Sequence, residues 1–114
     1  MKKLVFALSL ALLITSCASQ TEKFVTVKYR EDPVNIANSA FEYLNTSKSS
    51  FVRGAWYDEE NTYMVIKLQS TYYHYCGLPP ITWTQFKYAD SFGTTYNQKI
   101  KDRYDCRIGH VPDY

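Results

Sequence analysis

Residues 71–80 read TYYHYCGLPP, an aromatic strand pattern followed by a cysteine and a Gly-Leu-Pro-Pro segment. Large aromatic residues are favoured in strands, whereas a glycine followed shortly by two prolines stops strands and helices alike. The stretch therefore predicts a strand over residues 72–76 that ends abruptly at the glycine. Alternation along this strand places Tyr73 and Tyr75 on one face and His74 on the other.

Two more strand patterns precede this one. Residues 51–57 and 62–68 are rich in apolar and aromatic side chains, and each has the length of a typical strand. Residues 58–61 between them, Asp-Glu-Glu-Asn, predict a turn whose side chains face water. Further upstream, residues 24–30 alternate valines with polar residues and predict a strand, while residues 33–50 show no clear period and are expected to be irregular or partly extended.

Helical patterns follow the prolines. Trp83 and Phe86 lie on a common stripe, which predicts a first helix, and apolar residues recurring every fourth position from Phe92 to Tyr104 predict a second. Short strands followed by helices indicate a small α+β domain. We expect an antiparallel meander of three to four strands packed against two C-terminal helices.

The start of the chain has the features of a bacterial lipoprotein signal. Lys2 and Lys3 precede an apolar run over residues 4–14, which is too short to span a bilayer but suits a signal-peptide core. The following Ile-Thr-Ser-Cys resembles a lipobox, in which Cys17 becomes the acylated first residue of the mature protein. A plain secretory signal that happens to precede a cysteine is the alternative. Ala18 after the cysteine favours the outer membrane, and we expect the protein on its periplasmic face.

Removal of this signal makes the mature chain electrically neutral. The 114-residue chain has 13 basic and 11 acidic residues, and the signal takes two lysines with it. A neutral domain has no general attraction for nucleic acid or anionic lipid.

Cys76 and Cys106 remain as an even pair in an oxidising compartment, where disulfides persist. We expect a disulfide between them. His74 with Cys76, and Cys106 with His110, also have spacings that suit a Cys2His2 zinc site, but the compartment favours the disulfide. We expect neither a metal nor a cofactor.

Several short motifs together resemble the KTSC domain, a family named for its occurrence at the C-terminus of some lysyl-tRNA synthetases and found alone in small bacterial proteins. The motifs are Ser49-Ser50-Phe51, Trp56-Tyr57-Asp58, Tyr73-His74-Tyr75 with Gly77-Leu78-Pro79, Ala89-Asp90-Ser91-Phe92-Gly93, and Tyr96-Asn97 with Ile100-Lys101. The family has no established activity, and its association with synthetases suggests RNA binding. The lipoprotein signal and the resemblance together divide the chain into a signal (1–16), a tether (17–23), an N-terminal extension (24–48), a KTSC-like domain (49–105) and a tail (106–114).

Candidate binding residues come from the aromatic strand and from the last helix. Tyr73 and Tyr75 have the spacing of a stacking pair, although core packing is the more common role of strand tyrosines, and His74 lies between them. Lys99, Lys101 and Arg103 belong to a locally basic segment. No nucleophile and base arrangement is evident. We therefore expect a non-enzymatic envelope lipoprotein that binds a protein or glycan partner, with nucleic-acid binding through Tyr73 and Tyr75 as the alternative.

Overall fold

The structure is a computed structural model that describes residues 22–108 and 111–114, so the predicted signal and Cys17 lie outside the described residues. Its centre is a four-stranded antiparallel sheet with the strand order β3-β4-β5-β6. The strands are β3 (Glu42–Leu44), β4 (Val52–Asp58), β5 (Tyr63–Leu68) and β6 (Thr71–Cys76). Two helices, α1 (Pro80–Lys87) and α2 (Phe92–Lys99), follow in the chain. The predicted α+β meander is confirmed.

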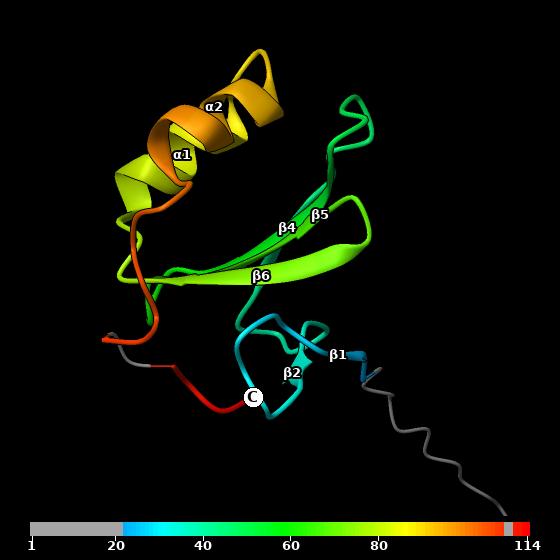
Figure 1. Ribbon diagram of the computed structural model, residues 1–114, viewed down its shortest axis with the longest axis vertical. Helices are drawn as coiled ribbons and strands as arrows, with labels where there is room; N and C mark the ends of the chain where they lie inside the picture. Colours follow the sequence, from blue (N-terminus) through cyan, green and yellow to red (C-terminus); the bar gives the residue numbers. More distant parts are fainter. Residues whose placement is uncertain (1–21, 109–110) are drawn as a thin grey trace, which may run out of the picture.

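The sheet lies between two layers (Figure 1). Both helices cover one face, and the short hairpin of β1 (Phe24–Val25) and β2 (Val34–Asn35) covers the other together with the C-terminal end of the chain. Each face has its own hydrophobic cluster. Met64, Ile66 and Leu68 of β5 point to the helices, whereas Tyr63 and Val65 point to the hairpin. Residues that alternate along one strand therefore serve two different cores.

The Gly-Leu-Pro-Pro segment turns the chain from β6 into α1 as its composition predicts. Gly77 adopts a φ of 70°, which favours glycine, and the Leu78 side chain is fully buried. The Tyr57 hydroxyl donates to the Leu78 carbonyl at 2.6 Å. Pro80 begins α1, where a missing N–H costs nothing. This connection fixes the first helix over the end of the sheet.

The second helix is shorter than the four-residue spacing predicts. It ends at Lys99, and Asp102 and Tyr104 both have positive φ values, of 64° and 57°. The predicted continuation to Tyr104 is therefore wrong. Ile100 is nonetheless fully buried and Tyr104 packs against the same cluster, so their spacing reflects burial on an irregular backbone.

The predicted strand over residues 24–30 is also mostly wrong. Only Phe24–Val25 is a strand, and Val27 forms an isolated parallel bridge to Tyr72 of β6. Val25 and Val27 are buried as their alternation indicates, but Tyr29 is 84% exposed and has a φ of 71°. The chain leaves the strand conformation here because it turns back toward β2.

Asp58 is a further correction, because it does not belong to a solvated turn. It ends β4 and is only 2% exposed. The Asn61 side-chain amide and the Tyr114 hydroxyl each donate to its carboxylate at 2.7 Å. Burial alone would raise the pKa of Asp58, but these hydrogen bonds hold it below its usual value. The Asp58 carboxylate therefore anchors the end of the chain to the sheet.

Gly54 lies at an irregularity in the pairing of β4 with β5, where the register shifts between Val52 and Ala55. Its φ is 142°, and a Cβ added there would lie 2.7 Å from the Trp56 ring. We predict that Gly54→Ala lowers the free energy of unfolding by about 2 kcal/mol or more, through backbone strain and displacement of the Trp56 ring. Denaturant titration of the variant measures this change.

Gly93→Ala is the matched control. Gly93 lies in α2, and the nearest neighbour of an added Cβ would be a Phe51 side-chain atom at 3.6 Å, an ordinary contact. Alanine is favoured over glycine in helices, so the control should be neutral or stabilised by up to about 1 kcal/mol. Equal destabilisation by both substitutions would contradict the account of Gly54.

Candidate functional site

A cleft of about 1400 Å³ runs along the outer edge of β6. Tyr73, His74 and Tyr75 form its floor. Strand β6 is the last strand of the sheet, and all of its residues except Cys76 are partly exposed. The cleft is therefore built on the edge where the sheet ends.

Two segments that are distant in sequence form the walls of this cleft. One contains Lys28 and Arg30 from the N-terminal side, and the other contains Arg103, Asp105 and Arg107 from the C-terminal side. Each wall contacts the strand through the backbone.

The two wall contacts are hydrogen bonds to β6 itself. The Lys28 N–H donates to the Tyr72 carbonyl at 2.9 Å, and the Cys76 N–H donates to the Tyr104 carbonyl at 2.9 Å. Uncovered sheet edges invite unwanted pairing, and covering segments reduce this tendency. Both ends of the β6 edge are covered in this way.

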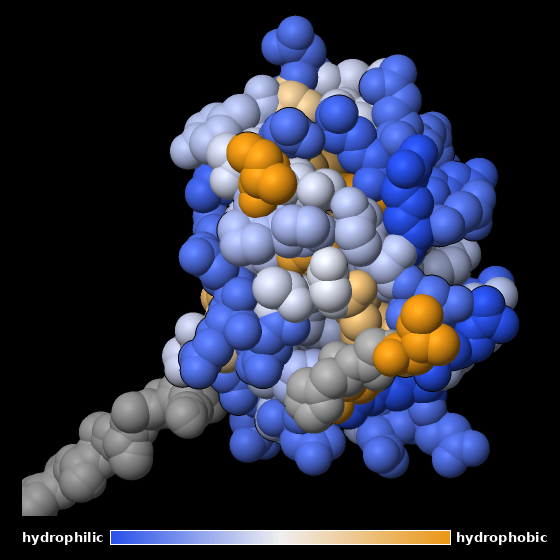
Figure 2. Space-filling model, turned by 90° about the vertical axis from the view of Figure 1, so that its left-hand side faces the viewer, coloured by the Kyte–Doolittle hydropathy of each residue, from blue (hydrophilic) through white to orange (hydrophobic). Residues whose placement is uncertain are grey.

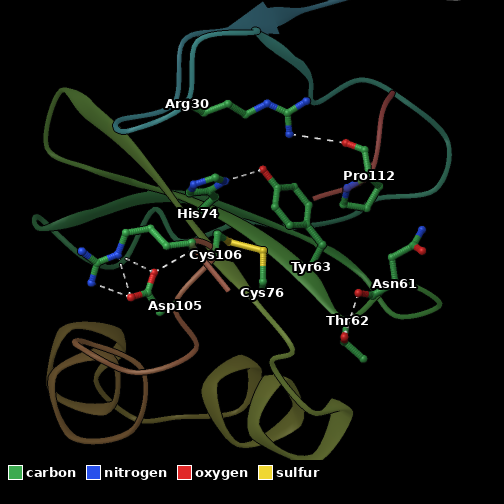
Figure 3. Close-up of a disulfide and its surroundings, with 10 residues drawn as sticks. Arg30, Asn61, Thr62, Tyr63, His74, Cys76, Asp105, Cys106 and Pro112 are labelled. Atoms are coloured by element: carbon green, nitrogen blue, oxygen red, sulfur yellow. Dashed lines mark hydrogen bonds and ion pairs between the residues drawn. A yellow bond between two sulfur atoms is a disulfide. The ribbon is translucent and has the colours of Figure 1, made fainter. Parts of the chain in front are cut away.

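A disulfide joins Cys76 to Cys106 beside the second of these contacts (Figure 3). The two Cα atoms are 4.8 Å apart, and the residues are separated by 30 positions in the chain. Closing a loop of this length stabilises a fold by about 3 to 4 kcal/mol in the chain-entropy model. The bond also fixes the C-terminal wall of the cleft to the end of β6.

His74 is held in place from the side opposite the helices. Its Nδ1 lies 2.9 Å from the Tyr63 hydroxyl, and Arg30 lies across from both residues (Figure 3). Burial lowers the pKa of His74, and the positive charge of Arg30 lowers this pKa further, against a smaller opposing effect of Asp105. Burial raises the pKa of Tyr63 to about 12, so its hydroxyl stays protonated. The pair is neutral at pH 7.

Tyr73 and Tyr75 face the helices and line the cleft with part of their surface. Both rings pack against the cluster that the helices cover. The Tyr75 hydroxyl forms a short hydrogen bond with the Tyr96 hydroxyl of α2. Lys28 Nζ lies 5.6 Å from the centroid of the Tyr73 ring, a cation–π distance. The predicted pair thus has a packing role and borders the cleft, with Tyr75 the more firmly fixed.

The predicted basic residues divide between the cleft and the remaining surface. Lys101 and Arg103 line the cleft, whereas Lys99 is exposed at the end of α2 and is not part of the lining. His110 lies outside the described residues. Within residues 22–108 and 111–114, no three His, Cys, Asp or Glu side chains gather closely enough to hold a metal ion. In the same part of the chain, no helix has both the length and the apolar character needed to cross a membrane.

Sequence reasoning missed the N-terminal wall and the anchoring of the tail. Nothing in the local pattern around Lys28 or Arg30 shows that this segment pairs with β6. Tyr114 belongs to the predicted tail, yet its ring centroid lies 4.5 Å from that of Phe41, and its hydroxyl donates to Asp58. Arg30 donates to the Pro112 carbonyl at 3.4 Å and joins the two walls (Figure 3).

The face of the molecule drawn in Figure 2 is mostly hydrophilic, and its apolar side chains are scattered. Among the described residues, Ile81 is 62% exposed and Ile108 is 90% exposed. Isolated exposed apolar residues are ordinary on soluble domains, whereas contiguous apolar patches mark contact surfaces.

The sheet, the helices and the order of the motifs correspond to a known domain. Residues 48–104 match the family model of the KTSC domain. The chain belongs to the KTSC domain family. A comparison with curated proteins found no match.

The matched segment contains the floor of the cleft but only part of its walls. Lys28 and Arg30 precede the match, and Asp105, Cys106 and Arg107 follow it. Strand β3 also precedes the match, although it pairs with β4 in the same sheet. The KTSC domain of this chain is therefore completed by flanking segments that shape the cleft.

The lowered pKa of His74 makes stability depend on pH. The unfolded chain binds a proton at His74 near pH 6.5, whereas the folded chain resists protonation until a lower pH. We predict that the free energy of unfolding falls as the pH is lowered from 7 to 5, modestly because His74 is partly exposed. His74→Gln should flatten this dependence. Denaturant titrations at both pH values measure it, and an unchanged slope in the variant would contradict the assignment.

Proposed function

We propose that this KTSC-domain protein is a lipid-anchored protein of the bacterial envelope that binds a partner in the β6 cleft without catalysing a reaction. The observation that carries the proposal is the cleft itself. Its floor is aromatic, its walls contain side chains of both charges, and its C-terminal wall is fixed by a disulfide. Binding sites commonly combine apolar surface with a few well-placed polar groups.

The proposed location is supported by the start of the chain and by the cysteines. A basic start, a short apolar core and Ile-Thr-Ser-Cys precede Ala18, which favours lipid on Cys17 and the periplasmic face of the outer membrane. Several acyl chains on one cysteine hold a protein at a membrane, whereas a single chain does not. The Cys76–Cys106 disulfide suits an oxidising compartment such as the periplasm.

The absence of catalysis is supported by the bonds that the histidine of the cleft and the two disulfide cysteines already form. His74 Nδ1 is engaged by Tyr63, and Cys76 and Cys106 are joined to each other. The joined cysteines cannot act as thiolate nucleophiles, and no nucleophilic side chain among the described residues contacts the other ring nitrogen of His74. Among the described residues of the cleft, the arrangement therefore favours holding a ligand over transforming it.

Nucleic-acid binding through Tyr73 and Tyr75 has less support. Stacking on bases requires exposed ring faces, but both rings pack against the helix-side cluster, and the Tyr75 hydroxyl is bound to Tyr96. The periplasm also lacks the nucleic acid that the domain would meet beside a synthetase. A protein or glycan of the envelope is the better candidate partner.

Site-specific photocrosslinking in living cells tests the binding role. We predict that a benzoylphenylalanine at position 73, in the cleft, gives a crosslinked adduct of defined mass, whereas the same substitution at Tyr88 does not. Tyr88 is the matched control because it is an aromatic residue, 74% exposed, outside the cleft. Adducts at both positions, or at neither, would argue against a partner in the cleft.

Metabolic labelling with an alkyne fatty acid tests the anchor in the same cells. The wild-type protein should carry the label and sediment with outer membranes, and Cys17→Ala should lose both properties. Labelling that survives this substitution would refute the assignment of Cys17.

A further inference from the structure

Among the residues that the structure describes, one position of the β6 backbone has no covering contact, and it lies between the two positions that do. In an antiparallel strand, the N–H and the carbonyl of one residue point to the same edge of the strand, and every second residue points to that edge. The Tyr72 carbonyl and the Cys76 N–H both face the outer edge, where Lys28 and Tyr104 bind them. The N–H and carbonyl of His74 must therefore face that edge as well. Within residues 22–108 and 111–114, no backbone group from outside the sheet forms a hydrogen bond with the His74 backbone.

The length of this gap limits what can fill it. The Cα atoms of Tyr72 and Cys76 are four residues apart, or roughly 13 Å along an extended strand. A peptide running the whole length of β6 would collide with Lys28 at one end and with Tyr104 at the other. A chain that ends in the gap would not. The free position accepts one extended residue, whose own N–H and carbonyl oxygen match those of His74.

The charges around the gap suit an anionic chain end. Five basic and four acidic side chains line the cleft. Two opposite-charge pairs form among them, Asp105 with Arg107 at 2.6 Å and Asp113 with Arg30 at 3.9 Å, so three basic side chains remain against two acidic ones. The Lys28 ammonium, by contrast, lies over the ring of Tyr73, the residue before His74. A carboxylate bound at His74 would therefore lie close to a lysine.

We propose that the open position of β6 captures the C-terminal residue of a peptide that carries a free α-carboxylate. The N–H of that residue donates to the His74 carbonyl, one carboxylate oxygen accepts from the His74 N–H, and the other lies toward the Lys28 ammonium. The inference rests on the proposed binding function and assigns its ligand class. The preceding residues of the peptide leave the edge and cross the cleft.

The probe is a pool of acetylated tetrapeptides ending in alanine, valine, leucine or phenylalanine, prepared with a free carboxylate or with a carboxamide. Titration into the ¹⁵N-labelled domain, followed by amide chemical shifts, should give a dissociation constant of about 1 mM or below for the carboxylate pool. The shifts should centre on His74. The carboxamide pool should bind about tenfold more weakly or worse, because a charge-assisted hydrogen bond is lost.

Paired variants separate the backbone of His74 from its side chain. His74→Pro removes the N–H that faces the outer edge but breaks no hydrogen bond between β5 and β6. Edge strands tolerate proline at such positions, so the variant should fold and should lose binding. His74→Val keeps the N–H but loses the contact with Tyr63, and it should bind nearly as well as the wild type. Lys28→Gln keeps its backbone bond to Tyr72, and it should weaken binding and reduce its dependence on salt.

Equal binding of the two pools, or no binding of either, would overturn the proposal. If His74→Pro fails to fold, the carboxamide pool and Lys28→Gln still decide the question. If the peptide pools give either of these negative results but the photocrosslink at position 73 still forms, the protein binds a partner of another ligand class in the cleft. Loss of the photocrosslink itself would count against the binding function.

Discussion

The edge of β6 is the constraint on which the rest of this structure depends. A meander of four strands leaves two outer edges, and the one on β6 borders the cleft of about 1400 Å³. Backbone hydrogen bonds from Lys28 and to Tyr104 cover its ends, and the Cys76–Cys106 disulfide keeps the second contact in place. Because each contact requires a segment to lie against the strand, protection of the edge also creates the walls of a cleft.

This arrangement relates the flanking segments to the family domain. The matched residues 48–104 contain the floor of the cleft, but the N-terminal wall and the disulfide partner lie beyond them. Arg30 joins the N-terminal flank to the C-terminal one through the Pro112 carbonyl, and Tyr114 ties the C-terminal flank to the sheet through Asp58. In this chain, residues outside the family model therefore form part of the walls of the β6 cleft. A lipid anchor on Cys17 would place that site near the membrane, since the predicted tether is short.

Local patterns predicted the sheet and the helices because strands and turns follow from neighbouring residues. The apolar patterns over residues 51–57 and 62–68 located β4 and β5 to within one residue, and the Gly-Leu-Pro-Pro segment located the end of β6. The failures concern contacts between distant residues. Asp58 looked like part of a solvated turn because its partner Tyr114 is 56 positions away, and the pairing of Val27 with Tyr72 has no local signal. The floor of the candidate site was predicted, but its N-terminal wall was not.

Native-state hydrogen exchange of the β6 amides shows whether the His74 position is open, because the exchange rate of each amide reports how well it is protected. We expect slow exchange at the Tyr73 and Tyr75 amides, which face β5, and at the Cys76 amide, which donates to the Tyr104 carbonyl. The His74 amide should exchange much faster than these three. Protection of the His74 amide equal to that of Cys76 would show that the edge is fully covered. The cleft would then lack the open position that this account gives it.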